Sequence, residues 1–303
     1  MYRLTASQRG YGYVSENRRL EPTARREVRN CYCCGLDDNR SILLENGFNL
    51  VKCNGCGTLF ISNPPTEETI SKSVVTGIYD GEKQLDVNVR YNRSALNFYK
   101  SILPEIFPTP LSARSTWLDV GCGYGEFLEA LHRKYGNKVI LKGSEPNERK
   151  QKAAQARGHN VGYLDLATSD ERFDIVSLMN VYSHLPNPPA FLSDLSRVVV
   201  PGGLLLIQTG DSSNIDQDNI MKPAGLPDHM SFTNVTALTG MLAHLDFKVE
   251  RIVHRPSVPF TPLQFGKEVA KFILPNRESF LRYYFVSSQK RSRSMLMLAR
   301  KSP

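Results

Sequence analysis

Two pairs of cysteines in the N-terminal part of the chain have the spacing of a metal site. Cys31 and Cys34 are separated by two residues, as are Cys53 and Cys56, and each pair is followed directly by a glycine. Two such pairs on converging tight turns offer four thiolates in the tetrahedral arrangement that Zn²⁺ prefers. We therefore predict a structural zinc site at these four cysteines, with uncoordinated thiols as the alternative and Cys33 outside the site.

A glycine-rich loop follows the apolar run TWLDV, which has the character of a buried strand. Asp119 lies at the end of that run, glycines stand at 121, 123 and 125, and a helical pattern begins at once. Glycines let the backbone turn tightly and approach a ligand at the end of a strand. A dinucleotide-binding loop would have its third glycine at position 126, where this chain has Glu126. Because a carboxylate there would repel a pyrophosphate, the loop favours a ligand that carries a positive charge.

The elements that must position these residues follow from the hydrophobic pattern. From residue 111 onward, short apolar runs alternate with helical patterns: TWLDVG, KVILKGSEP, NVGYLDL, FDIVSLMNV and GLLLIQTG. Such alternation is typical of a parallel sheet covered by helices. A helix capped by Thr233 or Asn234 and two more strands, KVERIVHR and SMLMLAR, complete this part. Earlier in the chain, ENG predicts a hairpin turn, NPPTEE ends the cysteine module, and residues 67–107 have a helical pattern.

Length, composition and charge limit the class of protein. With 303 residues and 41% hydrophobic content the chain can bury a full core. We find no run of 18 apolar residues and no secretory signal pattern at the N-terminus, so we expect a cytoplasmic protein with reduced thiols and no membrane partner. Residues 1–30 hold seven Lys/Arg against three acids, and residues 251–303 hold eleven against two. Basic ends around an acidic middle suit an anionic small substrate as well as a nucleic acid.

The sequence LDVGCGYGEFL resembles the first motif of the class I S-adenosylmethionine-dependent methyltransferases. GSEPNERKQKAAQARG and RFDIVSLMNVYSHLPNPPAFLSDLSRVVVPGGLLLIQTG agree with later parts of that family in order and spacing. The resemblance covers about 115–255 and implies a Rossmann-like α/β fold with a seven-stranded, mostly parallel sheet and helices on both faces. The cysteine module with its Pro-Pro exit is similar to the N-terminal zinc ribbon of a subset of these enzymes, some of which resemble sugar C-methyltransferases.

This resemblance implies which residues bind S-adenosylmethionine. Glu145 would accept hydrogen bonds from both ribose hydroxyls, which a carboxylate can do as a fork, although a solvated acid at a strand end is the alternative. Asp165 falls where the family contacts the adenine amino group, with Leu164 or Leu166 as alternatives. The full set of expected cofactor-binding residues is Asp119, Gly121, Cys122, Gly123, Gly125, Glu145, Pro146, Asp165 and Asn180.

The candidate catalytic residues lie where the sheet's C-terminal edge should face the methyl acceptor. His184 follows the fourth strand in NVYSHLP, and His229 follows the fifth in LPDHMSF, directly after Asp228. Histidine is the natural proton acceptor near neutral pH. A hydrogen bond that ties the loop is the alternative role for His184. Tyr79 is a further candidate from the segment after the ribbon, with packing on a neighbour as the alternative.

We therefore predict a basic arm at 1–30, a zinc ribbon at 31–62, a helical linker or lid at 63–110, and a methyltransferase domain at 111–303 with an insertion at 256–293. Its expected substrate is a small molecule such as a sugar, a nucleotide-sugar, or a natural-product or polysaccharide precursor, methylated on carbon or oxygen by a monomer or homodimer. An RNA methyltransferase that uses the ribbon and basic ends is one alternative. A cofactor-binding protein without turnover is the other.

Overall fold

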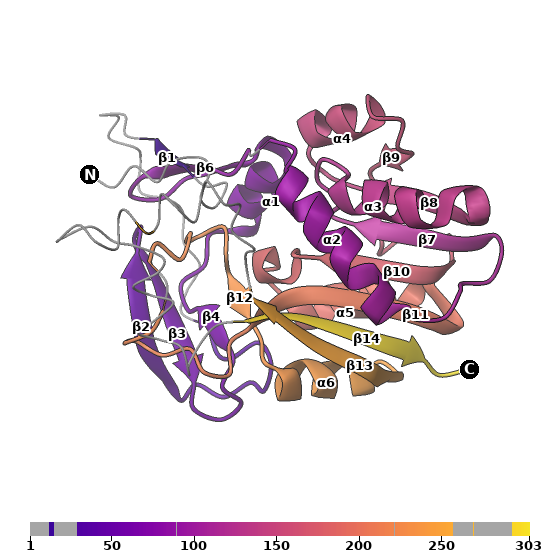
Figure 1. Cartoon of the computed structure of the whole chain (residues 1–303). Helices are drawn as coiled ribbons and strands as arrows, with labels where there is room; N and C mark the ends of the chain where they lie inside the picture. The colour runs from indigo at the N-terminus through magenta and orange to yellow at the C-terminus, as the bar shows by residue number, and fades with distance from the viewer. Residues whose placement is uncertain (1–11, 15–28, 89, 221, 257–268, 270–292) are drawn as a thin grey trace.

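The computed structural model describes residues 12–14, 29–88, 90–220, 222–256, 269 and 293–303 (Figure 1). Its centre is a seven-stranded sheet with the order β13-β14-β11-β10-β7-β8-β9. β14 runs antiparallel to both of its neighbours, whereas the β11-β10-β7-β8-β9 pairs are all parallel. The strands are β7 (Ser115–Val120), β8 (Val139–Ser144), β9 (Val161–Gly162), β10 (Phe173–Met179), β11 (Val199–Asp211), β13 (Phe247–Pro256) and β14 (Arg293–Lys301). The predicted mostly parallel, seven-stranded sheet is confirmed.

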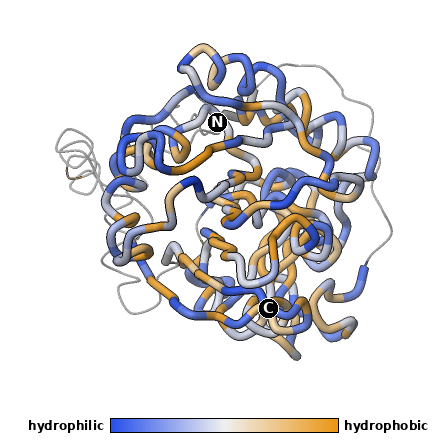
Figure 2. Tube along the Cα trace, turned by 90° about the vertical axis from the view of Figure 1, so that its right-hand side faces the viewer, coloured by the Kyte–Doolittle hydropathy of each residue, from blue (hydrophilic) through white to orange (hydrophobic). Residues whose placement is uncertain are grey.

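Helices cover both faces of this sheet because successive strand residues point to opposite sides. Trp117 packs in a cluster with residues of α2 (Arg93–Ile106) and α3 (Glu126–Tyr135). Its neighbour Leu118 packs in a second cluster with residues of α5 (Pro188–Arg197) and α6 (Val235–Ala243). Hydrophobic residues gather in the middle of the molecule and hydrophilic ones toward its outer loops and helices (Figure 2). In the part of the chain that the structure describes, no helix combines the length and apolarity needed to cross a membrane.

A second sheet contains the cysteine module. Its order is β12-β4-β3-β2, formed by β2 (Asn39–Glu45), β3 (Phe48–Cys53), β4 (Leu59–Ile61) and β12 (Ser231–Phe232). The predicted hairpin turn is present at Asn46 and Gly47, whose φ values are 53° and 79°. β12 comes from the segment after β11, about 170 residues farther along the chain than β4. This second sheet, called the ribbon sheet below, is therefore completed by a strand from the neighbouring domain.

The prediction of continuous helical structure over 67–107 is wrong in its middle. α1 (Glu67–Thr76) is capped by Thr66, but Gly77 adopts a left-handed conformation with φ 72° and ends it. β5 (Ile78–Tyr79) and β6 (Gln84–Asp86) then pair as an antiparallel hairpin. The hairpin is favoured over a helix because it buries the side chains of Tyr79 and Leu85. β1 (Gly12–Val14), from the predicted N-terminal arm, pairs with β6. The rest of residues 1–28 and almost all of the 256–293 insertion lie outside the described residues.

Candidate active site

Four loops meet at the edge of the sheet where the parallel strands end. The glycine loop follows β7, and Glu145 follows β8. The loop that carries His184 follows β10, and the segment that carries His229 follows β11. Because parallel strands end at one edge, segments more than a hundred residues apart in sequence are brought to one place, which is where α/β sheets bind ligands.

The glycine loop has the backbone conformation that the sequence predicts. Gly121, Gly123 and Gly125 all have positive φ, at 69°, 56° and 86°. A Cβ atom added at Gly121 would lie 2.4 Å from Val181 Cγ2, so a side chain there would collide with the loop after β10. At Gly123 the same added atom would meet no atom of the described residues within 4 Å. The loop is therefore packed on one side at Gly121 and open at Gly123, as a close backbone approach to a ligand requires.

Glu145 is buried and fixed against this loop. Its side chain accepts hydrogen bonds from the backbone N–H of Gly123 at 2.9 Å and of Asn147 at 3.0 Å. The solvated strand-end alternative is therefore inconsistent with the structure, since the residue is only 5% exposed. A carboxylate held in this way has lone pairs left to accept from the hydroxyls of a ligand.

Asp119 is a buried acid with one unused oxygen. Ser177, on the adjacent strand β10, accepts a hydrogen bond from Trp117 Nε1 at 2.9 Å and donates one to Asp119 Oδ1 at 2.6 Å. Asp119 Oδ2 is buried and has no hydrogen-bond partner among the described residues. Burial, together with the charges of Glu145 and Glu126, raises the pKa of Asp119 to about 7, against the opposing effect of the Ser177 hydrogen bond. Such a group is stabilised by a bound cation.

The other predicted cofactor residues have mixed placements. The Cys122 side chain packs in a small core with Leu128 and Ala154, and its backbone N–H donates to Ser144 O at 3.1 Å. The thiol and the N–H of Cys122 therefore both stabilise the fold. Asp165 is exposed and caps its own loop by accepting from Ala167 N and Thr168 Oγ1. Pro146 follows Glu145 and is partly exposed. Asn180, at the end of β10, is exposed and has φ 60°.

His184 and Asp228 form a pair where the sequence predicts that the sheet edge faces the methyl acceptor. His184 Nδ1 lies 3.0 Å from Asp228 Oδ1 and 3.1 Å from the Asp228 carbonyl oxygen, so Nδ1 carries a proton. Burial alone would lower the pKa of His184, but the charge and hydrogen bonds of Asp228 raise it above its ordinary value. Burial likewise opposes ionisation of Asp228, yet His184 holds its pKa below the ordinary value. Each group therefore favours the charged form of the other, the imidazolium of His184 and the carboxylate of Asp228.

His229 lies beside this pair with a fixed tautomer. Its ring centroid is 5.0 Å from that of His184, and one ligand atom from each of His184, Asp228 and His229 lies within 4.8 Å of the others. His229 Nδ1 lies 2.7 Å from the carbonyl oxygen of Ala224. Because a carbonyl can only accept, Nδ1 donates, and the neutral ring has its lone pair on Nε2.

Tyr79, although in a strand instead of the predicted helix, joins this group. Its side chain is 3% exposed. Burial raises the pKa of Tyr79 well above its ordinary value, as do the charge and hydrogen bonding of Asp228 and the charge of Glu145. The neutral phenol is thus within electrostatic range of both Glu145 and Asp228. All four predicted catalytic residues are brought to one region.

The four predicted metal ligands also come together. The sulfur atoms of Cys31, Cys34, Cys53 and Cys56 all lie within 4.8 Å of one another. Cys31 Sγ is 3.5 Å from Cys56 Sγ, and Cys34 Sγ is 3.5 Å from Cys53 Sγ. The glycines after each pair have φ values of 75° and 73°, and each donates its N–H to the carbonyl oxygen of the first cysteine of its pair. The two turns are therefore equivalent.

The sequence analysis did not identify two groups that contact predicted site residues, the Ser177 hydroxyl and the backbone carbonyl of Ala224. Ser177 has a usable signal, because it is a polar residue inside the buried run FDIVSLM and faces Asp119 across the parallel pair. The Ala224 carbonyl that fixes the His229 tautomer has none, since a backbone group is visible only in the folded chain.

Comparison with known proteins decides the family. A family model described as a methyltransferase domain matches residues 90–252, which is over half of the chain. The chain belongs to this methyltransferase family. The match confirms the prediction of a class I S-adenosylmethionine-dependent methyltransferase, and it covers the glycine loop, both histidines and most of the sheet.

Individual relatives agree with this assignment. The ubiquinone biosynthesis O-methyltransferase of Serratia proteamaculans is 26% identical over 185 residues, which cover 56% of this chain and 74% of that protein. The chloroplastic tocopherol O-methyltransferase of Arabidopsis thaliana is 33% identical over 107 residues, which cover 32% of this chain and only 31% of that protein. A Galdieria sulphuraria structure, provisionally named a sarcosine dimethylglycine methyltransferase, shares the fold with a TM-score of 0.52 at 18% identity over 68% of this chain and 85% of its own.

The residues present fit S-adenosylmethionine. The unpartnered, buried oxygen of Asp119 suits a cationic donor group, the open side of Gly123 admits a ligand, and Glu145 can accept from ribose hydroxyls. Three carboxylates, those of Asp119, Glu126 and Glu145, surround the loop. Their charge rejects a pyrophosphate and favours a cation, which agrees with the sequence prediction.

The raised pKa of Asp119 predicts a pH-dependent affinity. Because the ordinary value is 3.8 and the folded value about 7, the ligand-free fold binds this proton more tightly than the unfolded chain and loses stability as pH rises between the two values. The ionised acid above pH ~7 should strengthen S-adenosylmethionine binding by up to about tenfold. Asp119→Asn should abolish this dependence and raise the ligand-free melting temperature at pH ~8. Calorimetry and thermal melts at several pH values measure both effects, and an unchanged pH dependence in the variant would contradict the assignment.

Proposed function

We propose that this protein transfers the methyl group of S-adenosylmethionine to a small acceptor, of an anionic or glycosidic kind. The observation that carries the proposal is the placement of His184, Asp228 and His229 at the same sheet edge as the glycine loop and Glu145. Because the two relatives described above are named O-methyltransferases, a hydroxyl is the first choice of acceptor group. A sugar, nucleotide-sugar or natural-product hydroxyl fits this choice.

The residues divide the work between them. S-adenosylmethionine supplies an activated methyl group on its sulfonium, and Asp119, Gly123 and Glu145 would hold it. His229 removes the acceptor proton through Nε2, since its Nδ1 proton is committed to the Ala224 carbonyl. The imidazolium of His184, kept charged by Asp228, binds an anionic acceptor or stabilises the oxygen as it loses its proton. The buried phenol of Tyr79 lies within electrostatic range of Asp228.

We further propose that Cys31, Cys34, Cys53 and Cys56 bind a structural zinc ion. The sulfur separations of 3.5 Å are close to those of a tetrahedral tetrathiolate site with bonds of about 2.3 Å. Four ligands leave no open position, so the ion would stabilise the module and take no part in the reaction.

Zinc content should distinguish the ligands from their neighbour. Cys34→Ser should lose the metal and destabilise the ribbon, because three thiolates bind Zn²⁺ more weakly than four. Cys33→Ser is the matched control one residue away and should retain about one zinc per chain. Metal analysis of purified protein gives the answer, and equal zinc loss in both variants would refute the assignment.

The RNA methyltransferase alternative can be separated by the fate of labelled methyl groups. Protein is incubated with S-adenosylmethionine labelled in the methyl group and with a cell extract, which is then divided into RNA and small-molecule fractions. We expect the label in the small-molecule fraction, at a rate that changes little with salt. Label in nuclease-sensitive material, at a rate that falls steeply with salt, would favour the RNA alternative instead.

A further inference from the structure

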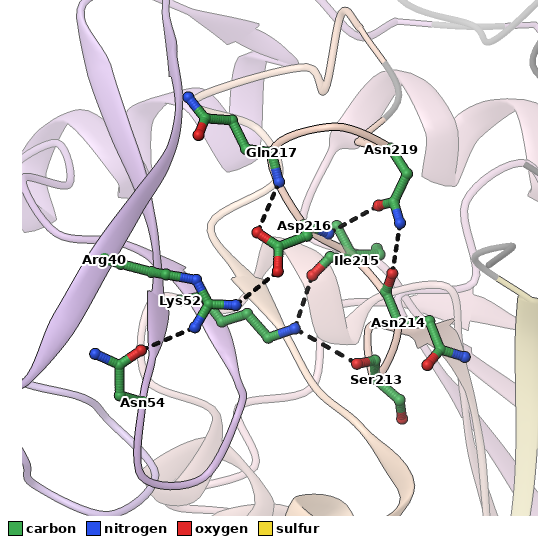
Figure 3. A network of polar contacts seen from close by, with 9 residues as sticks. All are labelled: Arg40, Lys52, Asn54, Ser213, Asn214, Ile215, Asp216, Gln217 and Asn219. Carbon is green, nitrogen blue, oxygen red and sulfur yellow. Dashed lines mark hydrogen bonds and ion pairs between the residues drawn. The ribbon is translucent and has the colours of Figure 1, made fainter.

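The ribbon sheet is attached to the segment between β11 and α6, which carries Asp228 and His229. Near the start of this segment, Lys52 Nζ donates to Ile215 O at 2.7 Å, and Arg40 forms an ion pair with Asp216 at 2.7 Å (Figure 3). Near its end, Ile61 N donates to Met230 O at 3.0 Å, and β4 pairs with β12. Side chains of the ribbon and of the segment also share one hydrophobic core, with members Ile42, Phe48, Leu50, Leu59, Ile61, Ile215, Leu226 and Met230.

Between these two attachments, Glu45 binds the turn that precedes His229. Its Oε2 accepts from Ala224 N at 2.7 Å, and its Oε1 accepts from Gly225 N at 2.8 Å and from Leu226 N at 3.0 Å. A carboxylate that receives three consecutive backbone N–H groups fixes the orientation of those peptide units. The carbonyl oxygen of Ala224 belongs to this turn and receives the Nδ1 proton of His229.

The next residue, Asn46, holds the hairpin that carries Tyr79. Asn46 Oδ1 accepts from Lys83 N at 2.5 Å, and Asn46 Nδ2 donates to Lys83 O at 2.9 Å. An added Cβ at Gly81 would lie 2.4 Å from Asn46 Nδ2, so the two turns are in close contact. The tip of the β2-β3 hairpin thus contacts both the turn before His229 and the turn after Tyr79.

We infer that Glu45 is a positioning residue, which sets the tautomer and orientation of His229 by holding the 224–226 turn. The inference rests on the proposed function, because it explains how the proposed base is prepared, and it gives the ribbon a role in the acceptor site. A merely stabilising ribbon would need no carboxylate directed at this turn. The ribbon sheet thereby acts on the methyl-acceptor side of the site, whereas the glycine loop and Glu145 belong to the main sheet.

The tautomer of His229 can be read directly by NMR. The whole 303-residue chain, loaded with zinc and with ¹⁵N-labelled histidine, is studied with S-adenosylhomocysteine bound, and His229→Gln assigns the signals. In the wild type we expect neutral His229 to carry its proton on Nδ1. Glu45→Ala should shift at least about half of the population to the Nε2-protonated tautomer, because the Ala224 carbonyl is no longer held. Glu45→Gln should lie between, since its amide oxygen still accepts from the turn.

Asp37→Asn is the control, since it replaces a carboxylate with an amide, as Glu45→Gln does, at an exposed position on the ribbon. It should leave the tautomer unchanged, and S-adenosylhomocysteine affinity should stay within about twofold in all variants. An unchanged tautomer in Glu45→Ala, or an equal change in Asp37→Asn, would overturn the inference. If Glu45→Ala does not fold, Glu45→Gln carries the same test. Failure of the proposed function is distinguishable, because it would appear as no methyl transfer by the wild type while the tautomer comparison remains readable.

Discussion

Replacement of Glu145 with alanine is expected to weaken S-adenosylmethionine binding by at least about 100-fold. The carboxylate would lose its hydrogen bonds to the ribose hydroxyls, and charged hydrogen bonds of this kind contribute about 1.5–3 kcal/mol each. The change also releases Gly123 N and Asn147 N, which Glu145 now holds at 2.9 and 3.0 Å. Isothermal calorimetry with the wild type and the variant measures the loss.

Glu148 provides the matched control for this prediction. It lies three residues farther along the chain, its side chain is 74% exposed, and it forms a surface ion pair with Lys152. Exposed pairs of this kind contribute little. Glu148→Ala should therefore leave the affinity within about twofold. An equal loss in both variants would show that the effect is one of general charge or folding, and unaltered binding in Glu145→Ala would remove Glu145 from the cofactor site.

Replacement of His229 with glutamine is expected to slow methyl transfer by about 1000-fold while S-adenosylmethionine still binds. General bases typically contribute 10²–10⁴-fold, and glutamine can keep a hydrogen bond to the Ala224 carbonyl but cannot take the proton. Single-turnover rates with labelled cofactor measure the loss. His244→Gln is the control, because His244 is an exposed residue at the end of α6 whose Nδ1 contacts the local Gly240 carbonyl.

His184 should produce a different signature in the same assay. Because its pKa is raised, the ion pair of its imidazolium with Asp228 contributes fully to stability below pH ~6.5 and is lost as pH rises through the folded value. Methyl transfer should therefore decline on the alkaline side of the pH profile. His184→Gln should lower the rate by about tenfold and remove that decline. A profile with the same alkaline limb in the variant would assign the limb to another group.

The parts of this molecule that the sequence predicts correctly depend on local patterns. The paired cysteines and the ENG turn specify the ribbon hairpin within about 25 residues. The glycine loop and the strand order place Asp119 and Glu145, because a parallel sheet collects its strand ends at one edge. The same rule brought His184 near Asp228 and His229 without any knowledge of their contacts.

The parts that the sequence could not predict depend on distant or very short elements. The two-residue strand β12 pairs with β4 about 170 residues away, and a strand so short has no local sequence pattern that predicts its pairing partner. The β5-β6 hairpin is missed because its buried alternation is only a few residues long and lies between two real helices. Glu45 looks like an ordinary acid beside a turn, and its role follows only from the three amides that the fold brings to it.

The glycine loop and the two histidines, His184 and His229, are proposed to form one methyl-transfer site. The most direct test is the single-turnover transfer of labelled methyl from S-adenosylmethionine to the small-molecule fraction of an extract, compared between wild type and His229→Gln at equal cofactor occupancy. We predict label in a small acceptor with the wild type and about 1000-fold slower labelling with the variant. Equal rates in the two proteins, or no transfer by the wild type to any small molecule, would contradict it.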